Sequence, residues 1–206
     1  MPSSPLWPSP RPLWQAAPEA VAAGCSGQRD GDHNTLSGPW RLLLLGDGSP
    51  TRHLQSLTGL AVEVDVIAME ADTDPGGEAP PEVAELDQPL LRRQVWLRCG
   101  RQTLAWAESW WNQSEADQHL QQRSQPIWRS LTANRAELYR EVDGLALVEA
   151  PALEQGFGRP GPYWSRHYRF FRGGRELTVI REVFSPAIEQ WLGPPNTLLH
   201  NVSQQK

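Results

Sequence analysis

Residues 92–111 read RRQVWLRCGRQTLAWAESWW, and this stretch decides the fold. Two strand-like runs flank the Gly-Arg-Gln at 100–102, which predicts an antiparallel hairpin. Because the side chains of a strand alternate between its two faces, Arg93 shares a face with Val95 and Leu97. If that apolar face packs against the core, Arg93 points inward, where a charge is costly without a partner.

A second hairpin is predicted nearer the C-terminus, where residues 163–171 and 176–184 flank a Gly-Gly turn. In its last strand, Glu182 shares a face with Ile180 and Phe184. The pattern therefore turns one arginine and one glutamate inward. Two buried charges either pair with each other or pair with a ligand, and the alternation alone leaves both interpretations open.

The elements around these hairpins complete the prediction of the fold. Ser49 and Pro50 are typical of a helix start, and a strand with period-two alternation follows at 62–66. Short helices are expected at 126–132 and 188–192, and a strand broken near Gly144 at 136–148. The sequence thus predicts an α+β domain, with an antiparallel sheet of about six strands and helices packed on it.

The 206 residues suit one domain with terminal extensions. Residues 1–38 are rich in Pro, Gly and Ser, which predicts a flexible arm. Residues 39–192 carry the strand and helix patterns and are expected to form the folded domain, and 193–206 form a polar tail.

Charge and composition exclude several classes of partner. Lys and Arg number 19 against 24 Asp and Glu, a net charge of −5, so neither nucleic-acid binding nor stable membrane association is expected. Cys25 and Cys99 have no metal-ligand spacing and are expected to be reduced thiols. With no signal-peptide pattern and no apolar run of membrane-spanning length, we expect a cytoplasmic protein.

The motifs of the common cofactor and triad enzymes are absent from the sequence. It contains no phosphate-binding or dinucleotide-binding glycine motif, no H-E-x-x-H and no G-x-S-x-G. The five histidines are scattered without metal-ligand spacing. We therefore expect neither a metal nor a cofactor.

Five segments, taken in order, carry a resemblance to a known family: LLLGDGSPTRHL (43–54), LRRQVWL (91–97), PI (126–127), YWSRHYR (163–169) and LTVIREVFSP (177–186). Together they resemble chorismate lyase, and most of all its cyanobacterial and plastid branch. The resemblance implies a small buried ligand cavity under flap-like helical segments. It also implies conversion of chorismate to 4-hydroxybenzoate and pyruvate without cofactor or metal, for quinone biosynthesis of the plastoquinone or ubiquinone type.

The resemblance also implies roles for particular residues. The carboxylate-binding arginine of the family falls on Arg93, and its glutamate, placed near the ring hydroxyl, falls on Glu182. Backbone contacts to the ligand carboxylate fall near Pro50 and Ile127, although a proline nitrogen cannot donate a hydrogen bond. The chemistry leaves open whether Glu182 acts as acid, as base or as a partner of the hydroxyl.

Two further arginines are candidates for the enolpyruvyl carboxylate of the substrate, Arg166 and Arg169. The alternative is that both are ordinary charges of a surface strand. We expect a monomer with chorismate and 4-hydroxybenzoate as its small-molecule partners.

Two competing hypotheses remain. The chain is a non-catalytic binding protein for 4-hydroxybenzoate or a similar aromatic acid, or it is a scaffold in which Arg93 and Glu182 bridge each other. The first predicts ligand binding without turnover, and the second predicts no ligand binding.

Overall fold

The computed structural model describes residues 8–22, 35–73, 75, 79–132 and 137–197. The strands are β1 (Arg11–Ala16), β2 (Thr35–Leu36), β3 (Val62–Asp72), β4 (Leu90–Cys99), β5 (Gln102–Asn112), β6 (Tyr139–Glu149), β7 (Tyr163–Arg172), β8 (Arg175–Phe184) and β9 (Asn196–Thr197). The α-helices are α1 (Pro18–Ala22), α2 (Gly38–Leu45), α3 (Pro50–Thr58), α4 (Gln113–His119), α5 (Ile127–Thr132), α6 (Pro151–Phe157) and α7 (Glu189–Leu192). Two 3₁₀ turns are η1 (Pro81–Glu85) and η2 (Pro186–Ile188).

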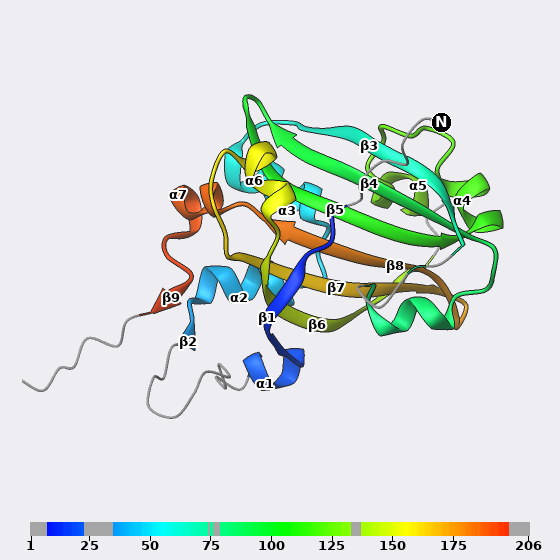
Figure 1. Cartoon of the computed structure of the whole chain (residues 1–206), viewed down its shortest axis with the longest axis horizontal. Coiled ribbons are helices and arrows are strands. Elements are labelled where there is room, and N and C mark those ends of the chain that lie inside the picture. The colour runs from blue at the N-terminus through cyan, green and yellow to red at the C-terminus, as the bar shows by residue number, and fades with distance from the viewer. Residues whose placement is uncertain (1–7, 23–34, 74, 76–78, 133–136, 198–206) are drawn as a thin grey trace, which may run out of the picture.

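Seven strands form one antiparallel sheet in the order β1-β6-β7-β8-β5-β4-β3 (Figure 1). The two predicted hairpins, β4–β5 and β7–β8, lie side by side in this sheet because β5 pairs with β8. A separate two-stranded ladder joins β2 to β9. The predicted α+β fold with an antiparallel sheet is confirmed, with one strand more than the six or so expected.

Tight turns close both hairpins where the sequence places glycine. Gly173 and Gly174, between β7 and β8, have φ values of 57° and 77°. A φ in this left-handed region is unfavourable for residues with a side chain, so a Gly-Gly pair permits the two-residue turn that sets the register of the strands.

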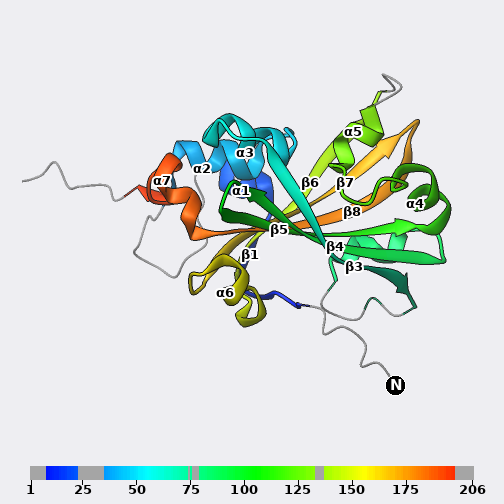
Figure 2. The same ribbon diagram turned by 90° about the horizontal axis from the view of Figure 1, so that it is seen from above.

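Helices cover the sheet on two sides. Figure 2 shows α2, α3 and α5 on one side of the sheet and α6 on the other. The start of α3 matches the prediction, with Ser49 in the extended conformation and Pro50 as the first helical residue. On the other side α6 packs tightly, because a Cβ atom at Gly156 would lie 2.4 Å from the Trp96 ring. Helix α6 itself was not predicted from the sequence.

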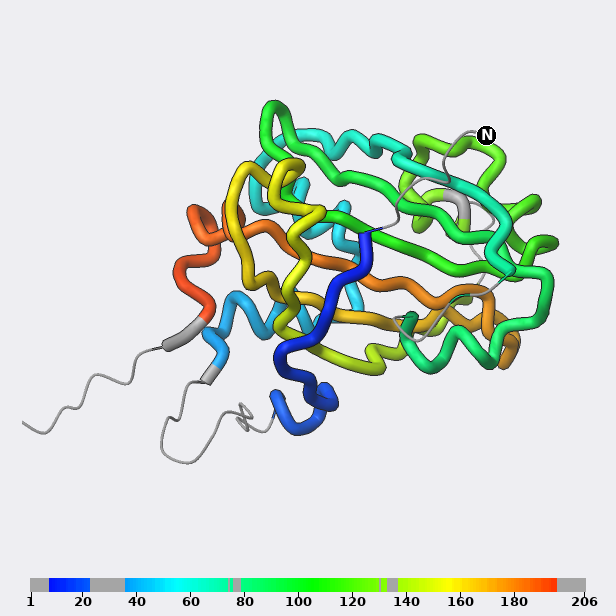
Figure 3. The backbone as a smooth tube through the Cα atoms, viewed as in Figure 1, coloured from blue at the N-terminus to red at the C-terminus, as the bar shows by residue number. Residues whose placement is uncertain are grey.

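The sheet begins earlier in the chain than the sequence indicates. Residues 11–16, within the predicted flexible arm, form the edge strand β1 against β6, as the backbone path in Figure 3 shows. The Trp14 ring packs edge-on against Trp164, with centroids 5.7 Å apart. The remainder of the predicted arm at 1–7 and 23–34, and of the tail at 198–206, lies outside the described residues.

Candidate active site

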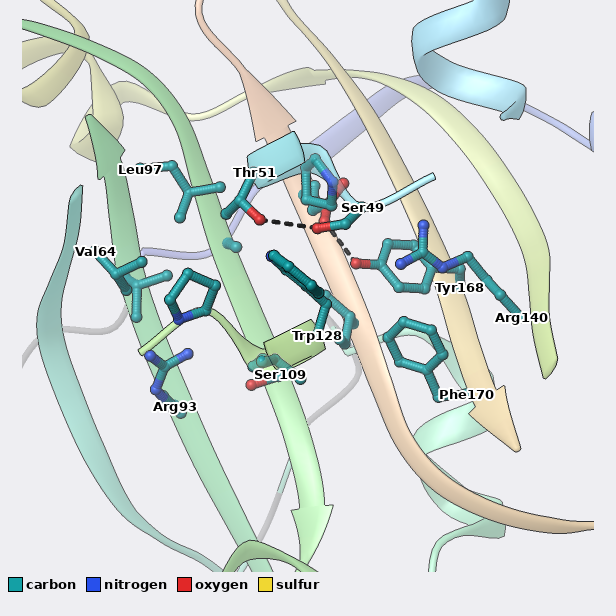
Figure 4. Close-up of a pocket in the computed structure, with 17 residues that line it drawn as sticks. Ser49, Thr51, Val64, Arg93, Leu97, Ser109, Trp128, Arg140, Tyr168 and Phe170 are labelled. Atoms are coloured by element: carbon teal, nitrogen blue, oxygen red, sulfur yellow. Dashed lines mark hydrogen bonds between the residues drawn. The ribbon is translucent and has the colours of Figure 1, made fainter. Parts of the chain in front are cut away.

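A cavity lies between the sheet and the helices α3 and α5 (Figure 4). Its floor is built from side chains of β3 to β8, and its walls come from residues at the start of α3 and of α5. The lining residues are Ser49, Pro50, Thr51, Val64, Arg93, Val95, Leu97, Ala107, Ser109, Pro126, Ile127, Trp128, Arg140, Tyr168, Phe170, Ile180 and Glu182. Three of these residues carry charge, and they are Arg93, Arg140 and Glu182.

The cavity is narrow in this structure. Its volume is about 40 Å³, which holds water molecules rather than an aromatic ring. Trp128 is the largest side chain among the lining residues and lies in the middle of the group in Figure 4. An aromatic ligand therefore requires displacement of lining side chains, and Trp128, at the start of the short helix α5, is the first candidate.

Arg93 extends from β4 into this cavity, as the alternation predicts. It is 3% exposed, its Nη2 donates to the backbone oxygen of Arg123 at 2.6 Å, and its buried Nε has no hydrogen-bond partner. Burial lowers the pKa of the guanidinium to about 10, because removal from water disfavours the charged form. Arg93 is therefore a desolvated cation that a ligand carboxylate would stabilise.

Glu182 reaches the same cavity from β8 and is 1% exposed. Its Oε2 accepts a hydrogen bond of 2.8 Å from Arg166 Nε, and its Oε1 accepts one of 2.6 Å from the Tyr168 hydroxyl. Glu182 therefore pairs with Arg166 and not with Arg93. This pairing removes the basis for a scaffold in which Arg93 and Glu182 bridge each other.

The strand register relates the two predicted residues to each other. Arg93 lies opposite Ser109, which lies opposite Ile180 on β8, two residues from Glu182. Arg93 and Glu182 thus lie on one face in neighbouring rows, two strand spacings or about 10 Å apart across the sheet.

Arg166 holds Glu182 and the chain that leads into α3. It is buried, and its Nη1 donates to the carbonyl oxygens of Leu43 and Gly46 at 2.8 and 2.9 Å. A cation at the C-terminus of a helix satisfies carbonyls that have no partner within the helix, here at the end of α2. Arg166 is thus fully engaged, and it is not among the residues that line the cavity.

Arg169 lies on the opposite face of the sheet. Its guanidinium pairs with Asp143, with an Nη2–Oδ1 distance of 2.7 Å, and with Glu85 at 3.1 Å. Because Arg166 and Arg169 are three residues apart on β7, their side chains leave opposite faces. Arg169 therefore does not reach the cavity.

Pro50 and Ile127 both line the cavity, at the start of α3 and of α5 respectively. Beside Pro50, the hydroxyls of Ser49 and Thr51 are 2.8 Å apart and also face the cavity. The first backbone amides of a helix have no partner within it. The N–H of Thr51, unlike the nitrogen of Pro50, therefore has a hydrogen to donate and no partner within the helix.

Sequence reasoning missed several polar residues of the cavity, among them Arg140 on β6 and Tyr168 on β7. Arg140 shares a face with Val142, and Tyr168 shares one with Arg166 and Phe170, so strand alternation could have placed both. Arg140 is harder to place, because the pairing of β6 with β7 shifts register between Val142 and Gly144. Such a bulge changes the face on which later residues lie.

The sequence also hides a buried charge cluster on the opposite face of the sheet. Glu108 has no exposed surface. It accepts hydrogen bonds from Arg92 Nε at 2.6 Å, from Gln94 Nε2 at 2.5 Å and from Arg181 Nη2 at 2.5 Å. Because one buried carboxylate compensates part of the charge of two guanidinium groups on this face, we assign the cluster to the structure of the fold.

Comparison with known proteins identifies the family. The model of a family described as "Chorismate pyruvate-lyase Rv2949c-like" matches residues 44–192. The chain belongs to this family. The match spans both hairpins, α3 and α5, and therefore every residue that lines the cavity.

Relatives within this family come from algae. The chain is 30% identical over 155 residues to the uncharacterized protein ycf21 of Cyanophora paradoxa, which covers 73% of this chain and 78% of that protein. It is 31% identical over 153 residues to ycf21 of Porphyra purpurea, covering 74% and 83% respectively. The chorismate lyase resemblance and its plastid branch are confirmed.

Solved structures share the fold of this chorismate pyruvate-lyase-like chain. The effector domain of PhnF from Mycobacterium smegmatis superposes with a TM-score of 0.53 at 14% identity, covering 70% of this chain and 92% of that domain. The possible transcriptional regulator YydK of Bacillus subtilis gives a TM-score of 0.50 at 15% identity, over 67% and 64%. Identities this low show the fold alone.

Within residues 8–22, 35–73, 75, 79–132 and 137–197, no group of three or more His, Cys, Asp or Glu side chains is arranged to hold a metal ion. No helix of these residues is both long enough and apolar enough to cross a membrane.

Proposed function

We propose that this protein is a chorismate lyase, which eliminates pyruvate from chorismate to give 4-hydroxybenzoate for quinone biosynthesis. The observation that carries the proposal is a single cavity, in a member of this family, that holds a desolvated Arg93 at one side and a hydrogen-bonded Glu182 at the other. These groups match the ring carboxylate and the ring hydroxyl of the substrate.

The reaction requires the protein to orient the substrate and to assist one proton transfer. The ether bond at C3 of the ring breaks, a proton leaves C4, and the ring becomes aromatic as the enolpyruvyl group departs and takes up a proton to become pyruvate. Aromatisation supplies the driving force. The residues present therefore need to hold the ring and to accept or relay one proton.

Arg93 binds the ring carboxylate in this proposal. A planar guanidinium can hold a carboxylate through two parallel hydrogen bonds, and its unpartnered Nε is one of the donors available. The resemblance adds backbone contacts to this carboxylate near Pro50 and Ile127, and both residues line the same cavity.

Glu182 lies at the ring hydroxyl and the C4 proton. Each of its carboxylate oxygens already accepts one hydrogen bond, from Arg166 and from Tyr168. A carboxylate oxygen has two lone pairs, so each oxygen can accept one more. This arrangement suits Glu182 as an acceptor for the substrate, with Arg166 and Tyr168 fixing its orientation.

The test is direct assay of the purified chain with chorismate, without added metal or nucleotide. We expect equimolar 4-hydroxybenzoate and pyruvate, above a control without enzyme because chorismate decays on its own. Arg93→Gln should abolish this activity. Arg98→Gln, on the same strand and the opposite face with its side chain 41% exposed, is the matched control and should retain it.

The second candidate function is a non-catalytic binding protein for 4-hydroxybenzoate or a similar aromatic acid. The observation that favours it is the shared fold with a domain described as the effector domain of PhnF. Titration with 4-hydroxybenzoate distinguishes the two. Binding without any turnover of chorismate would replace the lyase proposal with this one.

A further inference from the structure

Two arginines line the cavity, and its one carboxylate has another partner. Glu182 is paired with Arg166, which contacts it from behind the cavity wall. Arg93 and Arg140 remain, and no Asp or Glu among the described residues forms an ion pair with either of them. The ligand that best balances this cavity thus carries two negative charges rather than one.

Arg140 is held in place by contacts that leave its charge available. Its guanidinium carbon lies 4.4 Å from the centroid of the Tyr168 ring and 4.5 Å from that of Phe170. Its Nη1 donates to the backbone oxygen of Gly48, and its buried Nε has no partner. Stacking fixes the plane of a guanidinium without neutralising it, so donors remain for an anion.

The position of Arg140 fits the second carboxylate of the proposed substrate. In Figure 4, Arg93 and Arg140 lie at opposite ends of the cavity, with Trp128 between them. Arg140 is beside the Glu182 end, because Tyr168 contacts both residues. In chorismate the enolpyruvyl ether is on C3, next to the C4 hydroxyl and away from the ring carboxylate on C1.

We propose that Arg140 binds the side-chain carboxylate of an ether-linked dicarboxylate, at the end of the cavity opposite Arg93. This inference rests on the proposed function for the orientation of the ring, and it makes the site selective for the dicarboxylate substrate over the monocarboxylate product. Loss of the second carboxylate in the reaction removes the contact with Arg140. The product then keeps its contacts with Arg93 and Glu182 and loses the one with Arg140.

The test compares two stable ligands by calorimetry: 4-hydroxybenzoate, and 3-(carboxymethoxy)-4-hydroxybenzoate, which adds an ether-linked carboxylate at ring position 3. For Arg140→Gln we expect affinity for the dicarboxylate to fall about tenfold to hundredfold, the usual loss for a hydrogen bond to a charged group. Affinity for 4-hydroxybenzoate should change by less than about twofold. Arg101→Gln, in the exposed β4–β5 turn, should change neither.

Two outcomes would overturn the inference. Equal weakening of both ligands would assign Arg140 to the packing of Tyr168 and Gly48, and unchanged affinity for the dicarboxylate would leave it no part in recognition. Arg140→Met keeps the apolar stem over the rings and repeats the test if Arg140→Gln does not fold.

Failure of the inference and failure of the proposed function are separable. Turnover of chorismate by the wild type, with an unchanged KM in Arg140→Gln, refutes the role of Arg140 and keeps the lyase. Selective loss of dicarboxylate binding, in a protein without turnover, keeps the role of Arg140 and refutes the lyase. Wild-type protein that binds neither ligand refutes both.

Discussion

The Tyr168 hydroxyl donates a hydrogen bond of 2.6 Å to Oε1 of Glu182, and both side chains are buried in the same cavity. Burial and the nearby Glu182 charge raise the pKa of Tyr168, so the phenol stays protonated and acts as the donor at neutral pH. Tyr168 thus fixes one oxygen of the carboxylate, while Arg166 fixes the other.

Removing this donor should lower turnover without unfolding the protein. In Tyr168→Phe the ring remains to pack under Arg140, but Glu182 loses a charge-assisted hydrogen bond worth about 1.5–3 kcal/mol. We expect kcat with chorismate to fall about tenfold to hundredfold. Tyr139→Phe, at a tyrosine that is 64% exposed, is the control, and an unchanged kcat in Tyr168→Phe would exclude Tyr168 from positioning Glu182.

Arg93 should reduce stability in the absence of ligand. A buried cation without an anionic partner is costly, and apolar replacements of buried charges are often neutral or stabilising by about 1–4 kcal/mol. We expect Arg93→Met to raise the free energy of unfolding by about 1 kcal/mol in urea. The same variant should lose the stabilisation that added 4-hydroxybenzoate gives the wild type.

The matched control for Arg93→Met is Arg98→Met, on the opposite face of the same strand with its side chain 41% exposed, which should keep the response to ligand. A large loss of stability in Arg93→Met would show that the bond to the backbone oxygen of Arg123 outweighs the cost of burying the charge. Arg93 would then be a structural residue.

Removing a charge from the cluster around Glu108, on the face of the sheet opposite the cavity, should lower stability. Glu108 lies between Arg92 and Arg181 with no exposed surface. Glu108→Gln removes the negative charge between the two guanidinium groups. Breaking a buried ion pair in this way lowers the free energy of unfolding by about 3–5 kcal/mol. We expect a fall in Tm of about 6–20 °C, at 2–4 °C per kcal/mol for a chain of this size.

The control for Glu108→Gln is Glu63→Gln on β3, an exposed position where surface substitutions change stability by less than about 0.5 kcal/mol. If Glu108→Gln unfolds at the wild-type temperature, the cluster contributes specificity of the fold rather than stability.

How much of the site could be predicted depends on which residues a local pattern can place. Alternation with period two needs only neighbours in sequence, and it was enough to turn Arg93 and Glu182 inward. The same alternation puts Arg166 and Arg169 on opposite faces, because their spacing is odd, but the prediction treated the two arginines as equal candidates. Arg140 was not predicted as a cavity residue, because the bulge after Val142 interrupts the alternation of β6.

The remaining differences come from contacts between distant parts of the chain. Arg166 donates to carbonyl oxygens at the end of α2. Its partner Leu43 is 123 residues away in the sequence, so no local pattern could predict this contact. Strand β1 likewise depends on its pairing with β6, where Arg11 lies opposite Glu149. The composition of residues 1–38 predicted a flexible arm, which is wrong for residues 11–16, because composition carries no information about a distant strand partner.

The dependence of stability on pH should include a contribution from Glu176, a carboxyl group near Arg169 on the face of the sheet opposite the cavity. Burial raises the pKa of Glu176 to about 7, from its ordinary value of 4.5, and the Arg169 guanidinium opposes this shift. The folded state therefore holds this proton more tightly than the unfolded state. The stabilisation is fully present below pH 4.5 and is lost as the pH rises to about 7.

In Glu176→Gln this loss should disappear, so the variant gains stability relative to the wild type as the pH rises from about 4.5 to 7. The quantity to measure is the difference in urea unfolding free energy between variant and wild type at each pH. Burial lowers the pKa of His53, His119 and His167, which raises stability with pH in both proteins and cancels in the difference. A difference that stays flat over this range, as expected for the exposed control Glu63→Gln, would mean that Glu176 titrates alike in the folded and unfolded chain.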